Sequence, residues 1–296
     1  MSLLLFGGSG QVGREFLSLA MRKGIEVVAP TRTELNLHDA GTISQRIAAR
    51  SWSAIVNAAA YTDVDGAETA EAAAFAVNAE APKLLAYMAK RQRIPIIHIS
   101  TDYVFDGKKG SPYVENDKTA PLNVYGRSKL AGEQGVSEAN PRHVILRTSW
   151  VYSPYGKNFV RTIVRLAAER DQLTIVNDQR GCPTAADEIA SACLHIALKY
   201  ASDPDGTHRG IFHFAGEGDA TWFELATEIV ELTTGRTRRS PLLVPIRTSD
   251  YPTAAVRPAD TRLDCSAIEH AFGIRARPWR HALAATIARM DFEGAS

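Results

Sequence analysis

The chain has 296 residues, of which 45% are hydrophobic and 23% are charged, and its formal net charge at pH 7 is +1. This length provides a sizeable core for one large domain or two small ones. The near-neutral charge excludes a global field for nucleic acid or acidic membranes, and no window approaches about 20 uninterrupted apolar residues, as a membrane span requires.

The cysteines and the amino terminus predict a cytoplasmic location. Cys182, Cys193 and Cys265 are widely separated, odd in number and form no Cys-x-x-Cys pair, as is common in a reducing compartment. The apolar start at residues 1–6 reaches a glycine cluster at once and lacks a basic beginning. It is therefore too short for the hydrophobic region of a signal peptide.

The amino terminus also predicts a dinucleotide site. The apolar run Leu3–Phe6 is typical of a buried parallel strand, and Gly7, Gly8, Gly10 and Gly13 follow before a helical pattern begins. Glycines in this context permit a tight turn and close approach of a pyrophosphate. The helix start supplies free N–H groups and the positive end of the helix dipole. The alternative is a glycine-rich loop without a ligand.

The end of the second predicted strand, 26–29, bears on the choice of cofactor. An NAD site usually presents an acidic residue there to the ribose hydroxyls. This chain instead has Arg32, whose guanidinium can pair with a 2′-phosphate. We therefore expect NADPH, with NADH as the alternative because Glu34 follows closely.

Helices and strands then alternate as far as residue 152. We predict helices over 42–50 and 71–91, strands over 54–56, 94–99 and 143–146, and small residues Ala58, Ala59 and Ala60 where a cofactor can lie close to the backbone. Asn78 interrupts the long second helix and would bond to backbone or water near the site, or else lie on the surface. The alternation predicts an α/β fold with a Rossmann-type doubly wound parallel sheet.

Strands and helices alternate less regularly in the second half of the chain. We predict helices over 158–169, 188–200 and 279–290, strands over 173–176 and 211–214, and a capping box at Thr221. Residues 1–152 would form the dinucleotide-binding domain, with late strands from 173–214 joining its sheet. Residues 153–296 would contribute mainly a smaller, interleaved substrate-binding domain.

A phenol and an ammonium stand one helical turn apart at Tyr125 and Lys129, so both would point the same way. A nearby cation favours the phenolate and lowers the tyrosine pKa, which lets the phenol act as a general acid or base. Thr101 follows the predicted strand 94–99, at the strand end where open α/β sheets hold ligands. In a ketone reduction, Tyr125 would protonate the oxygen, Thr101 would donate a hydrogen bond to it, and Lys129 would hold the nicotinamide ribose.

Taken together, these motifs resemble the extended short-chain dehydrogenase/reductase family. Longer strings narrow the resemblance to its dTDP-4-dehydrorhamnose reductases; they lie at 6–13, 56–60, 100–105, 121–126, 129–133, 147–152, 177–184 and 257–263. The resemblance covers nearly the whole chain. It implies reduction of the C4 ketone of dTDP-4-dehydro-β-L-rhamnose, a nucleotide sugar, by hydride transfer from NAD(P)H, with Tyr125 as proton donor.

The resemblance also implies roles for matching positions. The expected cofactor contacts are Gly7, Gly10, Gln11, Val12, Gly13, Arg32, Asn36, Leu37, Ala58, Ala59, Ala60, Tyr61, Thr62, Tyr125 and Lys129. The expected substrate contacts are Val64, Thr101, Asp102, Tyr125, Trp150 and Arg257. Asn36 and Leu37 depart from the Asp-Ile or Asp-Phe that relatives often have near the adenosine, and Trp150 could alternatively be a core aromatic.

Metal and oligomeric state follow from the same resemblance. Some relatives dimerise through Mg²⁺ held by clustered glutamates. Glu15 matches one such position, but Asp187 stands where a glutamate is expected, so a magnesium-linked dimer is not favoured. The chain would act as a monomer or a homodimer, with no nucleic-acid or membrane partner.

Two other functions compete. The first is a sugar-nucleotide epimerase or dehydratase that retains NAD. Dehydratases of the family place Asp-Glu after the threonine, whereas Tyr103 follows Asp102 in this chain. The second is a non-catalytic regulatory subunit. The presence of all three predicted catalytic residues, Thr101, Tyr125 and Lys129, argues against it.

Overall fold

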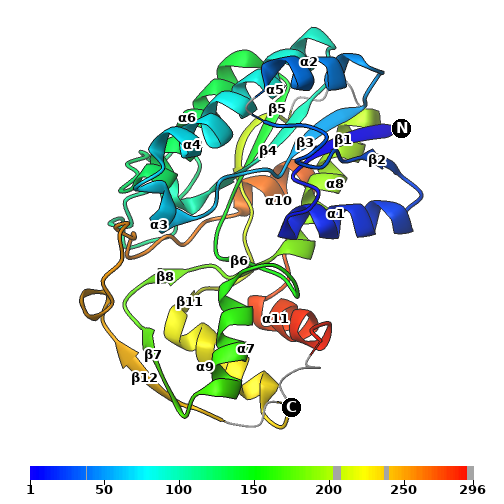
Figure 1. The fold of residues 1–296 in the computed structure, drawn as a ribbon. Coiled ribbons are helices and arrows are strands. Elements are labelled where there is room, and N and C mark those ends of the chain that lie inside the picture. The colour runs from blue at the N-terminus through cyan, green and yellow to red at the C-terminus, as the bar shows by residue number, and fades with distance from the viewer. Residues whose placement is uncertain (38, 203–207, 237–239, 292–296) are drawn as a thin grey trace.

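Two lobes meet at a cleft in the computed structural model, which describes residues 1–37, 39–202, 208–236 and 240–291 (Figure 1). The larger lobe holds the main sheet, and the smaller lobe is mostly helical. Within those residues, no helix combines the length and apolarity needed to cross a membrane.

The larger lobe is built on six parallel strands in the order β10-β5-β4-β3-β1-β2. Their bounds are β1 Ser2–Phe6, β2 Glu26–Val28, β3 Ala54–Asn57, β4 Ile96–Thr101, β5 His143–Thr148 and β10 Gly210–His213. Because β2 and β3 lie on opposite sides of β1, the strand order reverses there, and open α/β sheets bind ligands at such a point. The predicted Rossmann-type sheet is confirmed.

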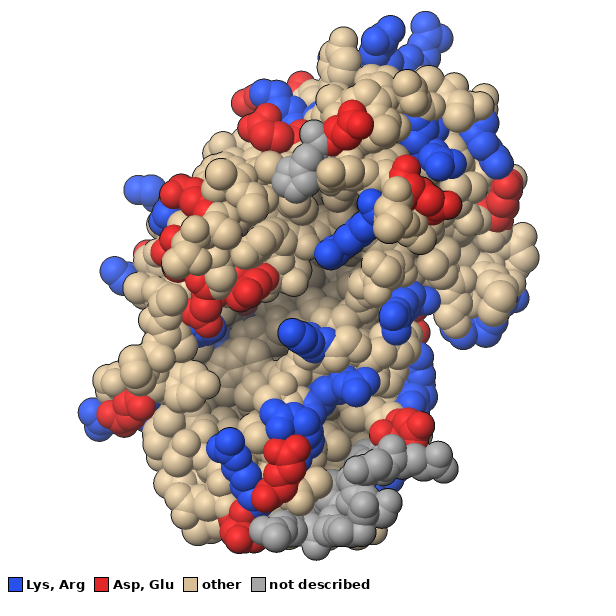
Figure 2. All heavy atoms as spheres, viewed as in Figure 1, with Lys and Arg blue, Asp and Glu red and all other residues tan. Residues whose placement is uncertain are grey.

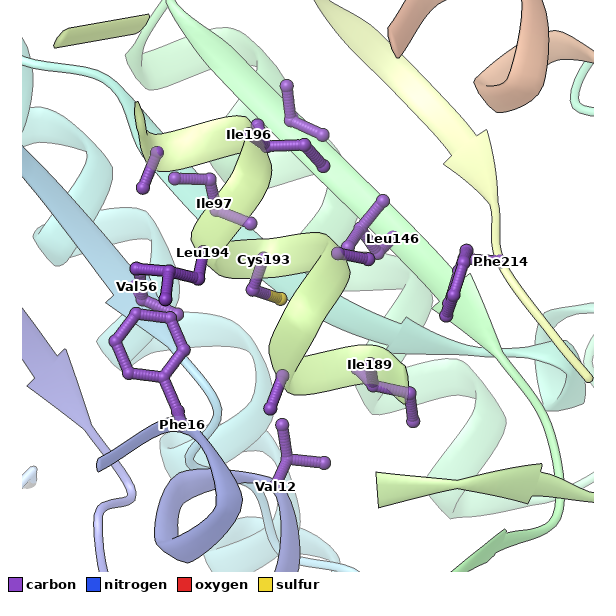
Figure 3. Close-up of a cluster of buried hydrophobic side chains, with 14 of the residues drawn as sticks. Val12, Phe16, Val56, Ile97, Leu146, Ile189, Cys193, Leu194, Ile196 and Phe214 are labelled. Atoms are coloured by element: carbon purple, nitrogen blue, oxygen red, sulfur yellow. The ribbon is translucent and has the colours of Figure 1, made fainter. Parts of the chain in front are cut away.

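Both faces of this sheet are covered by helices. Leu3, Leu5 and Val56 pack toward α1 (Gln11–Arg22), α8 (Ala186–Ser202) and α10 (Ser266–Phe272), and Figure 3 shows the side chains around α8. Leu4 and Ile55 pack on the opposite face, where α2 (Ala40–Ala48), α5 (Ala81–Arg91) and α6 (Val124–Ala139) lie. Since both faces are buried, the strands read as continuous apolar runs rather than alternating ones.

The long helix predicted over 71–91 is interrupted. α4 (Glu71–Phe75) leads into a π-helical turn (Ala76–Glu80) before α5 begins. Asn78 lies in that turn with its side chain fully buried. Its Oδ1 accepts from the Tyr61 N–H at 2.8 Å, and its Nδ2 donates to Tyr61 O and Ser128 Oγ at 3.0 Å. The surface alternative for Asn78 is therefore wrong, and the side chain fixes the segment that follows β3.

The smaller lobe packs three helices against a separate pair of strands. These elements are α7 (Phe159–Glu169), α9 (Trp222–Thr233), α11 (Trp279–Ala288), β7 (Gln172–Val176) and β12 (Leu242–Ile246). The expectation that 173–176 joins the main sheet is wrong, because β7 pairs with β12. Side chains of β7 alternate between buried and exposed, so the strand packs on one face only. The strand β10 does join the sheet, and the capping box of Thr221 with Glu224 is confirmed.

Candidate active site

A cleft of about 890 Å³ lies between the lobes at the carboxyl edge of the main sheet. The space-filling view shows it as a hollow with Lys and Arg side chains around its rim (Figure 2). Every residue that the sequence predicted for the site lines this cleft except Gly13 and Arg257. The fold thus brings the predicted cofactor and substrate residues to one place.

The glycine turn between β1 and α1 forms the floor of one end. Gly7 has φ +85°, and a Cβ on it would lie 2.6 Å from backbone atoms of Ala58 and Ala59. Gly13 supports the turn from behind, because its Cβ would stand 2.1 Å from the Gly7 oxygen. No side chain caps the start of α1, so its first N–H groups are available to an anion. This cradle fits a dinucleotide pyrophosphate.

Positively charged side chains also line the cleft. Arg32 does so as predicted, together with the neutral Asn36 and Leu37, and Arg14 and Lys157 line it as well. Sequence reasoning missed Lys157 because it lies in the loop that leads from β5 towards α7, where no motif was recognised. That loop reaches the glycine turn through Gln11, whose Oε1 accepts from Ser153 Oγ and Asn158 Nδ2, both at 2.9 Å.

The predicted catalytic side chains converge at the carboxyl end of β4. Thr101 is the last residue of β4, and Tyr125 lies in the first turn of α6, which Asn123 caps through the Gly126 N–H. The Thr101 hydroxyl lies near enough to the Tyr125 phenol to favour its ionised form. One turn further along α6, Lys129 Nζ donates to the Ile99 carbonyl at 2.7 Å. A hydroxyl, a phenol and an ammonium therefore face one region of the cleft.

The protonation of Tyr125 differs from the expectation. Burial is the main cause that raises the pKa of Tyr125 to about 12. The charge of Asp102 acts in the same direction, and the nearby Thr101 hydroxyl acts against it. The prediction that this pKa is lowered is wrong, because the cost of burying a phenolate dominates. The phenol is protonated at neutral pH, which is the form that a proton donor requires.

Lys129 is 2% exposed and rests beside His98. Burial lowers the pKa of Lys129 to about 8, and the Glu133 charge partly opposes that shift. The pKa of His98 is held well below its ordinary value, first by burial and then by the Lys129 charge, and its Nδ1 lies 3.0 Å from Asn57 Nδ2. The pKa of the Lys129 ammonium thus lies much closer to neutral pH than that of an ordinary lysine.

We expect kcat/KM to fall as pH rises through about 8, because the ammonium of Lys129 is lost across that value. Folding stability should change in the opposite direction. The unfolded chain binds the extra proton between about 8 and the ordinary lysine pKa, so stability rises with pH across that window. Rate profiles and unfolding curves over this pH range measure both trends. Asp102→Asn is the control, since the alkaline limb should survive it; a flat rate profile contradicts the assignment.

Asp102 is buried beside Thr101. Its Oδ1 lies 3.1 Å from Thr101 Oγ1, and its Oδ2 accepts from Thr261 Oγ1 at 2.5 Å. Burial, the dominant cause, raises the pKa of Asp102 to about 7. The side chain therefore joins the carboxyl end of β4 to the segment around Thr261.

Arg257 lies outside the cleft lining. Its guanidinium makes a two-armed ion pair with Asp65, with Nη2–Oδ2 at 2.8 Å and Nη1–Oδ1 at 3.1 Å. Asp65 belongs to α3 (Val64–Ala67), a short helix that the sequence did not reveal. The structure thus uses Arg257 to hold residues 255–257 against α3, and the cleft geometry gives no support to its prediction as a substrate contact.

The carboxylates considered for magnesium do not fit a metal. Glu15, 2% exposed, is paired with Arg289, whose Nη2 lies 2.6 Å from Glu15 Oε1 and whose Nη1 lies 3.9 Å from Asp187 Oδ2. Arg277 pairs with Asp187 as well, at 3.1 Å. Guanidinium groups thus neutralise these carboxylates. Across the described part of the chain, no three His, Cys, Asp or Glu side chains gather as metal ligands.

We expect excess EDTA or added MgCl₂ to leave the molar mass in solution and the thermal midpoint unchanged, because arginines already neutralise Glu15 and Asp187. Light scattering after gel filtration and a thermal scan measure the two quantities. Arg289→Ala serves as the comparison, since it exposes Glu15 to solution cations. A magnesium-dependent change of mass in the unaltered protein contradicts this expectation.

The parallel sheet, the glycine turn and the Thr101–Tyr125–Lys129 arrangement define a nucleotide-binding α/β protein of the short-chain dehydrogenase/reductase class. The model of the RmlD substrate binding domain family matches residues 1–292, and the chain belongs to that family.

Named relatives are similar over nearly the full length. The dTDP-4-dehydrorhamnose reductase of Sinorhizobium fredii is 43% identical over 294 residues, which cover 99% of each chain. The crystal structure of a dTDP-4-dehydrorhamnose reductase from Clostridium acetobutylicum has a TM-score of 0.90 and 33% identity, covering 97% of this chain and 99% of that one. The enzyme from Bacillus anthracis, solved in complex with NADP, has a TM-score of 0.89 and 29% identity, covering 98% and 99%.

Proposed function

We propose that the protein is a dTDP-4-dehydrorhamnose reductase, which reduces the C4 ketone of dTDP-4-dehydro-β-L-rhamnose to dTDP-L-rhamnose with NADPH. The observation that carries this function is the convergence of Thr101, Tyr125 and Lys129 in a cleft that begins at the glycine turn. Relatives at 36–43% identity that bear this enzyme name support the choice of substrate.

The residues act in one step. NADPH, when bound in the cleft, would supply the hydride that the ketone carbon accepts. Tyr125 donates its phenolic proton to the ketone oxygen, and Thr101 donates a hydrogen bond to the charge that develops there. Lys129 binds the ribose hydroxyls, and its ammonium stabilises the phenolate that remains after proton transfer. Hydride and proton together convert the ketone into an alcohol.

Further assignments accompany this function. We propose that the cleft residues predicted as cofactor and substrate contacts take those roles, that residues 1–152 form the dinucleotide-binding domain and that 153–296 mainly bind the nucleotide sugar. We place the protein in the cytoplasm as a monomer or homodimer. The free thiols Cys182, Cys193 and Cys265 suit that compartment.

The test is a turnover assay with authentic dTDP-4-dehydro-β-L-rhamnose. We expect absorbance of the reduced nicotinamide to fall and dTDP-L-rhamnose to accumulate, faster with NADPH than with NADH. No consumption of either cofactor rejects the function. Tightly bound NAD in the purified protein, together with turnover that needs no added cofactor, supports the retained-NAD epimerase or dehydratase instead.

Arg32→Ala is expected to raise KM for NADPH roughly tenfold or more and to leave KM for NADH nearly unchanged, because a charge-assisted contact to the 2′-phosphate is lost. Arg32 is exposed at the mouth of the cleft, so the substitution leaves the core intact. Arg22→Ala, on the outer surface of α1, is the matched control. Equal effects on both cofactors contradict a 2′-phosphate role.

A further inference from the structure

Two indoles meet face to face in the wall of the cleft. Trp150 lies in the connection between β5 and β6 (Val151–Tyr152), and Trp222 opens α9 in the smaller lobe. Both line the cleft. Their ring centroids are 3.5 Å apart and their planes differ by 2°. The stack therefore joins the end of the main sheet to the smaller lobe beside the catalytic side chains.

The backbone of Trp150 is held in a conformation that bulky residues rarely adopt, with φ +47°. Ser149 Oγ donates to Cys182 O at 2.7 Å and accepts from the Cys182 N–H at 3.2 Å, while the Thr184 N–H donates to Trp150 O at 3.2 Å. A Cβ on Gly181 would stand 2.5 Å from Cε2 and Nε1 of the Trp150 ring. The neighbouring segment thus fixes the backbone and leaves room for the indole.

Trp222 is fixed independently of Trp150. Its Nε1 donates to Gln179 Oε1 at 3.1 Å, and Gln179 Nε2 donates to Thr248 Oγ1 at 3.1 Å. The Phe159 ring packs against Trp222 with centroids 4.5 Å apart and planes tilted by 48°. The capping box of Thr221 with Glu224 orders the first turn of α9 beneath it. Trp222 therefore presents a preset surface to the other indole.

We propose that Trp222 is a positioning residue, which stacks on Trp150 and holds that indole as a rigid aromatic wall against the sugar of the bound substrate. The inference rests on the proposed function. Stacking of two parallel aromatic rings stabilises the pair by more than the burial of their apolar surface alone. A wall ordered before binding removes an entropic cost at binding, so Trp222 should affect KM more than kcat.

Trp222→Ala is expected to raise KM for dTDP-4-dehydro-β-L-rhamnose roughly tenfold, with kcat and the NADPH dissociation constant close to those of the unaltered protein. Trp222→Phe should recover part of the loss in KM, because a phenyl ring still stacks although it lacks the hydrogen bond to Gln179. The Trp222→Ala change should add nothing to the loss already caused by Trp150→Ala, since one acts through the other. Trp52→Phe, under α2, is the control.

A second readout requires no turnover. Two parallel indoles in contact give an exciton couplet in circular dichroism, which should be present in the cofactor-free protein and in Trp52→Phe but absent from Trp222→Phe. Gln179→Met keeps both indoles but removes the hydrogen bond to Trp222. It should weaken the couplet and raise KM roughly fivefold, which keeps the test open if Trp222→Ala fails to fold.

Three results would overturn the positioning role. They are an unchanged KM in Trp222→Ala, additive losses in the double variant, and no couplet in the unaltered protein. Additive losses mean that Trp222 contacts the sugar directly. Absence of turnover in the unaltered protein rejects the proposed function, whereas normal turnover with an unchanged KM in Trp222→Ala rejects only the positioning role.

Discussion

Tyr125→Phe is expected to lower kcat by roughly 10²–10⁴-fold while NADPH binds as tightly as before. The substitution removes only the proton that the ketone oxygen receives, because Lys129 and the glycine turn remain in place. Single-turnover oxidation of NADPH measures the chemical step, and a binding titration measures the affinity. The reduction requires a protonated phenol, and burial raises the pKa of Tyr125 to about 12, so that donor is fully protonated at neutral pH.

Tyr103→Phe is the matched control for this prediction. Tyr103 also lines the cleft and packs edge to face on Tyr125, with ring centroids 5.7 Å apart. Removing its hydroxyl takes a phenol from the same cleft without removing the proton donor, so most turnover should remain. If Tyr125→Phe retains full turnover, another group must protonate the ketone.

Glu133→Ala is expected to destabilise the fold by about 3–5 kcal/mol, because it leaves a buried guanidinium without its counter-charge. Arg147 and Glu133 are joined at 2.7 Å with side chains only 3% and 2% exposed, and Ser100 Oγ donates to the same carboxylate at 2.5 Å. Urea unfolding followed by circular dichroism measures the change in free energy of unfolding.

Glu169→Ala provides the comparison within the same chain. The Arg165–Glu169 pair has the same 2.7 Å separation, but its side chains are 60% and 50% exposed. Its loss should therefore cost less than about 1 kcal/mol. A second comparison replaces Glu133 and Arg147 together with methionine, which should recover much of the loss. Equal destabilisation by Glu133→Ala and Glu169→Ala contradicts the dominant effect of burial.

Local pattern was sufficient for the elements that position the cofactor. The run Leu3–Phe6 with its glycines, and the one-turn spacing of Tyr125 and Lys129, are readable because each depends on neighbours along the chain. The π-helical turn around Asn78 could not be predicted from the sequence. It depends on the hydrogen bond between Asn78 and Tyr61 and on the close approach of α6, which arise only in the folded chain. The pairing of β7 with β12 likewise depends on a strand that lies far along the sequence.

The residues of the candidate site that the sequence did not predict also depend on contacts between distant parts of the chain. Lys157 and Trp222 enter the cleft from segments beyond the main sheet, and no short motif marks either of them. The pKa of Tyr125 was expected to fall because a cation lies one turn away, but sequence spacing carries no information about desolvation. The position of Arg257 was also hidden from the sequence, because its partner Asp65 becomes its neighbour only after folding.

The Gln11 amide has a consequence for how the two ligands bind. It lies at the start of α1, yet its oxygen receives hydrogen bonds from Ser153 and Asn158, which lead into α7 of the smaller lobe. One pair of hydrogen bonds thus links the glycine turn to the lobe that we propose binds the sugar. Since linkage is reciprocal, any change that the cofactor makes to the affinity for the sugar nucleotide should be matched by an equal factor in the other direction.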